Sequence, residues 1–313
     1  MLTIVGRRLL ELVLVLVVAS ALVFGLLFVV SDPVASYGAR SRSPEVRQEL
    51  RHRYGLDRPL YVQYARWVRR LAAGDLGTSM VHPSEQVGTI VASKTANTAR
   101  LAAVAFAVEL ALGALVAVVA QISGRGLADR AIALASALTL GMPVVLVCLI
   151  LQQLFALRWR MLPLSGSPSG GVLGVDAHVV LPAAALVLTD AALVARVLRG
   201  ALGHAIVGEH VRAARATGVS ELRVFRRHVL QVALPEALPY LGLLVGSLFT
   251  GAVIVENVFG YDGLGRALVV AILSDDNPVV LGVTVYSVVV FVVVASVVDI
   301  VRGWLDPRIR TVR

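Results

Sequence analysis

The stretch GEHVRAARATGVSELRVFRRHVLQVALP, residues Gly208 to Pro235, is a charged interruption between two apolar runs. Glu209–Thr217 is rich in helix-forming residues, and Gly218 suits the left-handed position that follows many helix ends. Ser220 is a good N-cap for a second helix, with Glu221 in its first turn near the positive end of the helix dipole. The closing proline is expected to limit that helix. The stretch therefore predicts a helix, a sharp turn and a second helix, which project from the apolar part of the fold.

The apolar runs on both sides of this stretch are long enough to cross a bilayer, which takes about 20 mostly apolar residues. Together with the rest of the sequence they predict an all-α polytopic membrane protein with six transmembrane helices. A triplet of the form seen at signal-peptide cleavage sites, Ala19-Ser20-Ala21, lies inside the first run, so we expect that run to be retained. The six predicted spans are Leu9–Val30, Leu101–Gln121, Ala131–Leu157, Val179–Val197, Leu238–Phe259 and Val279–Val301.

Composition agrees with a membrane protein. Hydrophobic residues make up 58% of the 313 positions and charged residues only 16%, with a mean hydropathy of +0.82, which is too apolar for a soluble domain of this size. Of the 29 basic residues, 28 are Arg, and the formal net charge is +9. These Arg residues gather between the apolar runs, which favours membrane orientation over nucleic-acid binding. The single cysteine, Cys148, excludes an intrachain disulfide.

The distribution of Arg predicts the orientation. The link 123–130, the segment 199–227 and the tail after Val301 are rich in Arg, whereas the loops 158–178 and 260–278 together carry only three. The positive-inside rule then places both termini in the cytoplasm. Residues 31–98 carry ten Arg or Lys, but a loop of this length crosses the membrane largely regardless of charge. We expect a small external domain there, with an amphipathic helix at Leu60–Leu71.

A family resemblance arises at the core of the charged stretch. Ala213-Ala214-x-x-x-Gly218 resembles the EAA loop of ABC importer permeases, the loop that docks into a groove on the ATPase subunit in that family. Arg212 stands where the general motif has Glu, and Leu234-Pro235 comes about four residues late. Both departures resemble the dipeptide/oligopeptide permease branch.

Other segments extend this resemblance, in order, over nearly the whole chain. At Asp262 the branch usually has proline, so the loop there is expected to bend differently. The matching segments are Tyr54–Val68 with Gly74–Ser79, Asp129 through Pro143 to Leu162–Gly166, Glu256–Ile272, and Leu305–Arg310.

The resemblance implies the ABC importer type I permease fold and an assembly. Its regions would be 1–30 with the first span, the external domain 31–98, the permease core 99–305 with a coupling loop at 200–235, and a cytoplasmic tail 306–313. The chain would form a heterodimer with a homologous second permease in the lipid of the cell membrane. Two ATPase subunits and an extracytoplasmic peptide-binding protein would complete the importer, with no nucleic acid. The chain would catalyse nothing and hold no cofactor or metal, because ATP and Mg would be bound by the partner subunits.

Two groups of candidate residues follow. Polar side chains within spans are costly in lipid and could line a path or gate, although interhelical hydrogen bonds would also explain them. Those candidates are Asp190, Ser247, Thr250, Glu256 and Asn257, with Arg196 as an expected counter-ion for Asp190. The residues expected to couple to the ATPase are Glu209, Arg212, Ala213, Ala214, Arg215, Gly218, Ser220 and Glu221.

Three local features concern the backbone and a nucleotide motif. Pro143 is expected to kink the third span, and Gly242-x-x-x-Gly246 permits close helix approach. The run Gly88–Thr95 nearly matches a phosphate-binding P-loop, but Ser93 replaces the second required glycine, so we reject it.

Two other classes of function remain open at this point. A secondary transporter or channel would work alone, and such folds often show inverted repeats and broken helix pairs, which the sequence does not display. Co-purification with ATPases would distinguish an importer subunit from it. An intramembrane enzyme would need a facing catalytic pair, and substitution of Asp190 or Glu109 would then abolish chemistry.

Overall fold

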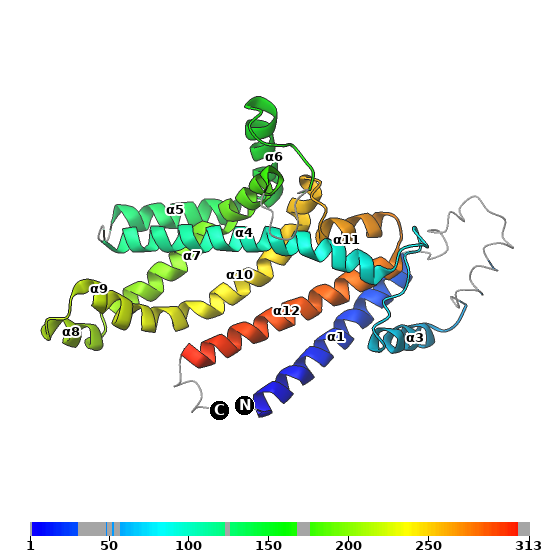
Figure 1. Cartoon of the computed structure of the whole chain (residues 1–313), viewed down its shortest axis with the longest axis horizontal. Helices are drawn as coiled ribbons and strands as arrows, with labels where there is room; N and C mark the ends of the chain where they lie inside the picture. Colours follow the sequence, from blue (N-terminus) through cyan, green and yellow to red (C-terminus); the bar gives the residue numbers. More distant parts are fainter. Residues whose placement is uncertain are drawn as a thin grey trace. The chain divides into compact units, whose positions relative to one another are not determined.

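The computed structural model describes residues 2–30, 48, 52, 57–122, 126–167 and 176–305 (Figure 1). These residues are almost entirely helical, and the single pairing of extended backbone among them is the antiparallel bridge between Thr78 and Gln86. The chain divides into two compact units. Unit 1 comprises Met1–Thr98 and Asp262–Val292, and unit 2 comprises Ala99–Tyr261 and Val293–Arg313.

Unit 1 is built around helices that pack through aromatic side chains. Trp67 is buried in a cluster with Leu281 and Val285, and the ring of Phe24 lies 5.5 Å from that of Tyr64. The amphipathic helix predicted at Leu60–Leu71 is confirmed as α3. The elements of unit 1 are α1 (Leu2–Val30), α3 (Leu60–Ala72), the start of α4 (Val87–Ile122), α11 (Leu264–Leu273) and the start of α12 (Asn277–Leu305).

Unit 2 is organised around α7, which packs against α5, α6 and α10. A Cβ on Gly113 of α4 would lie 2.5 Å from Val194 Cγ1, so α4 and α7 are close enough there to exclude a larger residue. A Cβ on Gly242 of α10 would likewise lie 2.7 Å from Val298 Cγ1. This confirms the close helix approach predicted for Gly242. Besides the rest of α4 and α12, unit 2 contains α5 (Leu127–Gly141), α6 (Val144–Leu151), the π-helix η3 (Gln152–Arg158), α7 (Ala177–Ile206), α8 (Glu209–Ala216), α9 (Glu221–Val224), the π-helix η4 (Phe225–Val229) and α10 (Leu230–Val258).

The third predicted span is broken rather than kinked. The helices Arg130–Thr139 and Val144–Arg158 are bent by 96° relative to each other. Met142 between them is extended, with φ −99° and ψ 118°. Pro143 disfavours helical geometry in the residue before it and cannot donate a helical hydrogen bond, so it accounts for the break.

Several helices can cross a membrane, but the predicted number is not settled. Four helices of the described chain are long and apolar enough, or five if the bent pair counts as one span. Within α1, the apolar segment Val13–Leu27 is shorter than these. The all-helical, multi-span architecture is confirmed, and six spans remain a prediction. The four helices are Val87–Ile122, Ala177–Ile206, Glu221–Gly246 and Asn277–Val298.

One predicted boundary is wrong. Pro235 does not limit the helix that contains it, because α10 runs through both Pro235 and Pro239. Apolar packing of Ala233 and Ala237 holds this part of α10, and membrane helices tolerate the loss of single backbone hydrogen bonds. The first turns of α4, from Val87, lie within the predicted external segment, and α11 lies within the predicted connecting segment 260–278, so the domain bounds stay predictions. The predicted tail 306–313 and residues 31–47 of the external domain are not among the residues described.

Candidate functional site

The charged stretch after α7 forms the predicted pair of helices, α8 and α9, joined by a tight turn. Gly218 adopts φ +76°, and its N–H donates to the Arg215 carbonyl at 3.0 Å while Val219 N–H donates to Ala214 at 3.2 Å. These two hydrogen bonds define a Schellman motif, which places its left-handed residue at the glycine. A side chain on that residue would be strained, so Gly218 fixes the direction in which α9 leaves. We name residues 208–229 the helical hairpin.

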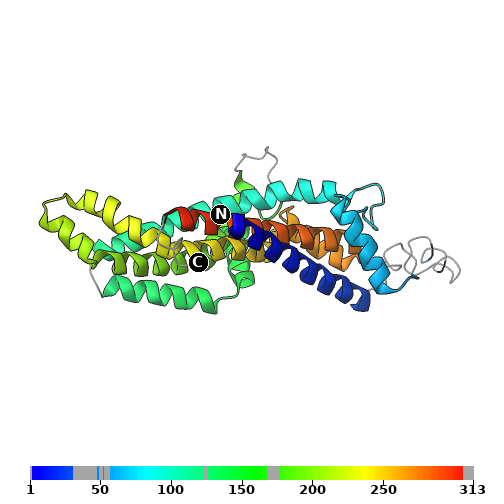
Figure 2. The ribbon, with the colours of Figure 1, turned by 90° about the horizontal axis from the view of Figure 1, so that it is seen from below.

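One side of the helical hairpin belongs to the core of unit 2. Val211, Val224 and Val229 are fully buried in a cluster that includes Leu198 and Ala205 of α7. In two perpendicular views, α8 and α9 extend beyond the ends of α7 and α10 (Figures 1 and 2). The helical hairpin is therefore anchored by apolar contacts and is not a loose loop.

The other side of the helical hairpin carries most of the residues predicted to couple to an ATPase. Ala214 is the exception, because it is buried among the apolar anchors just described. The predicted residues that are exposed are Glu209, Arg212, Ala213, Arg215, Gly218, Ser220 and Glu221.

An ion pair spans the turn of the helical hairpin. Arg215 Nε and Nη2 donate to Glu221 Oε1 and Oε2 at 2.9 and 3.1 Å, a bidentate arrangement. The hydrogen bond to Glu221 raises the pKa of the Arg215 guanidinium above its ordinary value. Ser220 occupies the N-cap position of α9 as predicted, but its side chain makes no capping hydrogen bond. Its carbonyl accepts from Arg223 N–H at 2.9 Å, so the turn is held by backbone and by the ion pair.

Leu222 is a surface residue that the sequence analysis missed. Its side chain is 68% exposed, although its neighbour two positions on, Val224, is buried. Two residues correspond to about 200° around a helix, so the buried position of Val224 turns Leu222 toward solvent. The sequence signal was a lone leucine between Glu221 and Arg223 in an otherwise charged turn.

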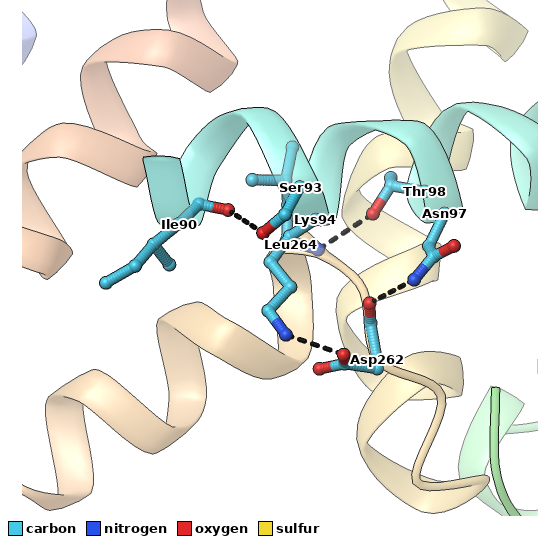
Figure 3. A network of polar contacts seen from close by, with 7 residues as sticks. All are labelled: Ile90, Ser93, Lys94, Asn97, Thr98, Asp262 and Leu264. Atoms are coloured by element: carbon cyan, nitrogen blue, oxygen red, sulfur yellow. Dashed lines mark hydrogen bonds and ion pairs between the residues drawn. The ribbon is translucent and has the colours of Figure 1, made fainter. Parts of the chain in front are cut away.

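Unit 1 contains a different polar arrangement, which we name the unit 1 clamp (residues 79–81, 94–98, 262–264 and 276). Lys94 Nζ lies 2.5 Å from Asp262 Oδ2, and Asn97 Nδ2 donates to the Asp262 carbonyl at 2.8 Å (Figure 3). Leu264 N–H donates to Thr98 Oγ1 at 2.8 Å, so a side chain of α4 caps the first residue of α11. Lys94 and Asn97 thus both hold the loop at Asp262, and the different bend expected for this loop stays a prediction. The near P-loop at 88–95 is helical, so it forms no phosphate-binding loop.

Asp276 forms the second part of the unit 1 clamp. Its carboxylate accepts Met80 N–H at 3.0 Å and Val81 N–H at 3.4 Å, and it accepts the hydroxyl of Ser79. Asp276 and Ser79 are buried. Charge-assisted hydrogen bonds of this kind tie the turn before α4 to the start of α12.

Polar side chains also lie inside unit 2. Glu109 of α4 is 0% exposed, and neither carboxylate oxygen has a hydrogen-bond partner among the described residues. The close approach of Gly113 to Val194, one turn further along both helices, places Glu109 near Asp190 of α7. The expected pairing of Asp190 with Arg196 is wrong, because Arg196 Nη2 instead donates to the Ala133 carbonyl at 3.3 Å.

The remaining path candidates are placed differently. Glu256 is buried, and its carbonyl accepts Tyr261 N–H at 2.8 Å, whereas Asn257 is exposed. Burial raises the pKa of the Tyr261 hydroxyl to about 12. Ser247 and Thr250 belong to α10, but their side chains are outside the part of the chain that the structure describes. The structure thus brings Glu109 and Asp190 together and leaves the path role of all these residues a prediction.

Comparison with known proteins gives a consistent result. Residues 109–311 match the family described as "Binding-protein-dependent transport system inner membrane component", and residues 1–99 match its N-terminal companion. The chain is 33% identical to the di/tripeptide transport system permease protein DppB of Pseudomonas aeruginosa, over 99% of both chains. It is 30% identical to the dipeptide permease DppB of Bacillus subtilis, over 87% of this chain and 86% of that one. The oligopeptide permease OppB of Haemophilus influenzae is also 30% identical, over 87% of both.

A solved structure shares the fold. A chain described as an amino acid ABC transporter with histidines superposes with a TM-score of 0.53 at 17% identity. The match covers 69% of this chain and 94% of that one.

Proposed function

The chain belongs to the binding-protein-dependent transport system inner membrane component family, and on that premise we propose that it forms half of the translocation path of a peptide importer. It is a multi-pass inner-membrane permease component of an ABC importer. The solute would be di- or oligopeptides, which is supported by the names of its relatives. The second half of the path would come from a homologous permease in a heterodimer.

The helical hairpin would transmit ATP-driven movement to the membrane helices. The observation that carries this proposal is its two-sided construction, with Val211, Val224 and Val229 locked in the core and charged residues exposed. A push on the exposed side would move α7 and α10 together because both ends of the helical hairpin continue into them. Two partner subunits would bind the ATP and Mg, and this chain would hold no cofactor.

The exposed surface indicates the chemistry of the partner. Four arginines of the helical hairpin are exposed, as is the apolar side chain of Leu222. They are Arg212, Arg223, Arg226 and Arg227. A groove with an apolar floor and an acidic rim would complement it, because burial of the leucine supplies affinity and the charges set the register.

The orientation follows from the same surface. If the helical hairpin contacts an ATPase, it lies in the cytoplasm, and the positive-inside rule then places both termini there. The peptide-binding protein would dock on the opposite side of the membrane. Asp190, Glu256 and Asn257 remain candidates for lining the path, together with Ser247 and Thr250.

Substitution of Gly218 tests this function. Gly218→Ala causes no steric clash, because the added Cβ meets nothing within 4 Å, but it strains the backbone at φ +76°. Gly218→Pro is more disruptive because the proline ring cannot adopt a positive φ. In proteoliposomes with all partner subunits, we expect dipeptide uptake to fall several-fold for Ala and to be lost for Pro, while ATP hydrolysis persists.

The matched control is Gly88→Ala, which adds the same Cβ in open space within the regular helix α4. It should transport as the unsubstituted chain does. Unchanged uptake by correctly inserted Gly218→Pro would refute the coupling role.

A further inference from the structure

Unit 2 contains a hollow that the transport function does not use. Its volume is about 400 Å³, and it lies between α4, α5 and α7. Gly200 and Gly203 keep it open, because a Cβ on either would meet nothing within 4 Å. Nine residues line it: Gln121, Ile132, Ala133, Arg196, Arg199, Gly200, Gly203, His204 and Val207.

Among the described residues that line the hollow, two carry positive charge and none carries negative charge. Arg196 and Arg199 are one turn apart on α7 and both contribute to it. Arg196 donates one of its N–H groups to Ala133, which leaves other guanidinium donors for a ligand. His204 Nδ1 lies 2.8 Å from Glu236 Oε1. The carboxylate of Glu236 is therefore already paired with the histidine.

The position of the hollow suits the headgroup of a lipid. It follows α7 to Val207, directly before the helical hairpin, where the apolar span gives way to charged sequence. Ile132 and Val207 add an apolar border that glycerol or the start of an acyl chain could contact. Basic pockets between membrane helices on the cytoplasmic side bind anionic headgroups, and guanidinium groups match phosphate oxygens in pairs.

We propose that this hollow binds an anionic phosphate group, carried by a phospholipid or free in solution. A zwitterionic lipid such as phosphatidylcholine fits less well, because its ammonium would approach the two guanidinium groups. Occupancy would link α5 to the end of α7 next to the helical hairpin. Binding itself requires neither peptide nor ATP, so it can be tested apart from transport.

The test measures lipid retention by native mass spectrometry on the full-length chain in neutral detergent. Phosphatidylglycerol is offered alone, against phosphatidylcholine, and with inorganic phosphate as competitor. We expect preferential retention of phosphatidylglycerol. Arg196→Gln and Arg199→Gln should each weaken it about fivefold, the effect of one basic residue near a lipid surface.

Gly200→Leu is the sharper variant, because it fills the hollow and leaves every charge in place. It should abolish the preference for phosphatidylglycerol over phosphatidylcholine. The controls are Arg158→Gln, which removes a charge from a residue of unit 2 that does not line the hollow, and Gly88→Leu, which adds the same side chain to the part of α4 that belongs to unit 1. Both should retain phosphatidylglycerol normally.

The competition distinguishes the two sources of phosphate. Retention that inorganic phosphate does not reduce identifies the lipid, and displacement by millimolar phosphate identifies a free phosphate site. Equal retention of both lipids, or retention of phosphatidylglycerol by monodisperse Gly200→Leu at the normal level, overturns the proposal. If the unsubstituted chain retains phosphatidylglycerol but the complete transporter takes up no peptide, the lipid site stands and only the transport assignment fails.

Discussion

The helical hairpin of unit 2 and the unit 1 clamp are both polar, but their polar groups are used in opposite ways. In the unit 1 clamp, the Asp276 carboxylate and the Thr98 hydroxyl are buried and satisfied by backbone N–H groups of the same unit. In the helical hairpin, the backbone closes its own turn at Gly218, and the charged side chains stay exposed. Buried polar contacts of the first kind stabilise a fold, whereas exposed charges of the second kind are available to a partner.

The largest effect on stability is expected from Asp276→Ala. It leaves the Met80 N–H and the Ser79 hydroxyl without their acceptor in a buried site, which lowers the free energy of unfolding by about 3 kcal/mol. Unfolding can be followed by reaction of the buried thiol of Cys148 with a maleimide dye. Asp276→Asn keeps one acceptor oxygen and should lose less. Equal stability of the Ala variant and the unsubstituted chain would show that the hydrogen bonds of Asp276 do not stabilise unit 1.

Thr98→Val should have a smaller effect in the same region. Valine keeps the shape of threonine but cannot accept the Leu264 N–H, so we expect a loss of about 1 to 2 kcal/mol. Thr98→Ser retains the hydroxyl and serves as the control. If valine and serine behave alike in the thiol-reaction assay, the capping of α11 by this hydroxyl does not contribute to stability.

Arg215→Gln in the helical hairpin should leave stability unchanged. The ion pair with Glu221 is exposed, and water screens such pairs. Uptake should nevertheless fall, because the charge arrangement presented to the ATPase changes. The free energy of unfolding and the rate of dipeptide uptake are measured on the same preparations, so that an effect on coupling is distinguished from an effect on stability. A marked loss of stability with normal uptake would reverse the contrast between the two regions.

The sequence predicted what depends on local patterns. Apolar runs located the long helices, and Gly218 predicted the turn between α8 and α9, because a left-handed helix end has a strong local signature. The break at Pro143 was expected only as a kink, since the 96° angle depends on packing around α5 and α6.

Contacts between distant residues could not be predicted. Lys94 and Asp262 are 168 positions apart, and Ser79 and Asp276 are 197 apart, so no periodicity links them. Asp190 was paired with Arg196 because the two are close in sequence, but the close approach of α4 to α7 places Glu109 near Asp190, and Arg196 donates to Ala133 instead. Leu222 was missed because its exposure depends on the burial of Val224 against α7.

Site-directed crosslinking from Leu222 tests the central claim most directly. With Cys148→Ser as background, Leu222→Cys is the sole thiol of the chain, on the exposed tip of the helical hairpin. In inner membranes that contain the complete transporter, we expect it to crosslink to the ATPase subunit, and addition of nucleotide should change the yield. In intact cells it should resist a maleimide that cannot cross the membrane. Labelling from outside, or no crosslink to any nucleotide-hydrolysing subunit, would contradict the account.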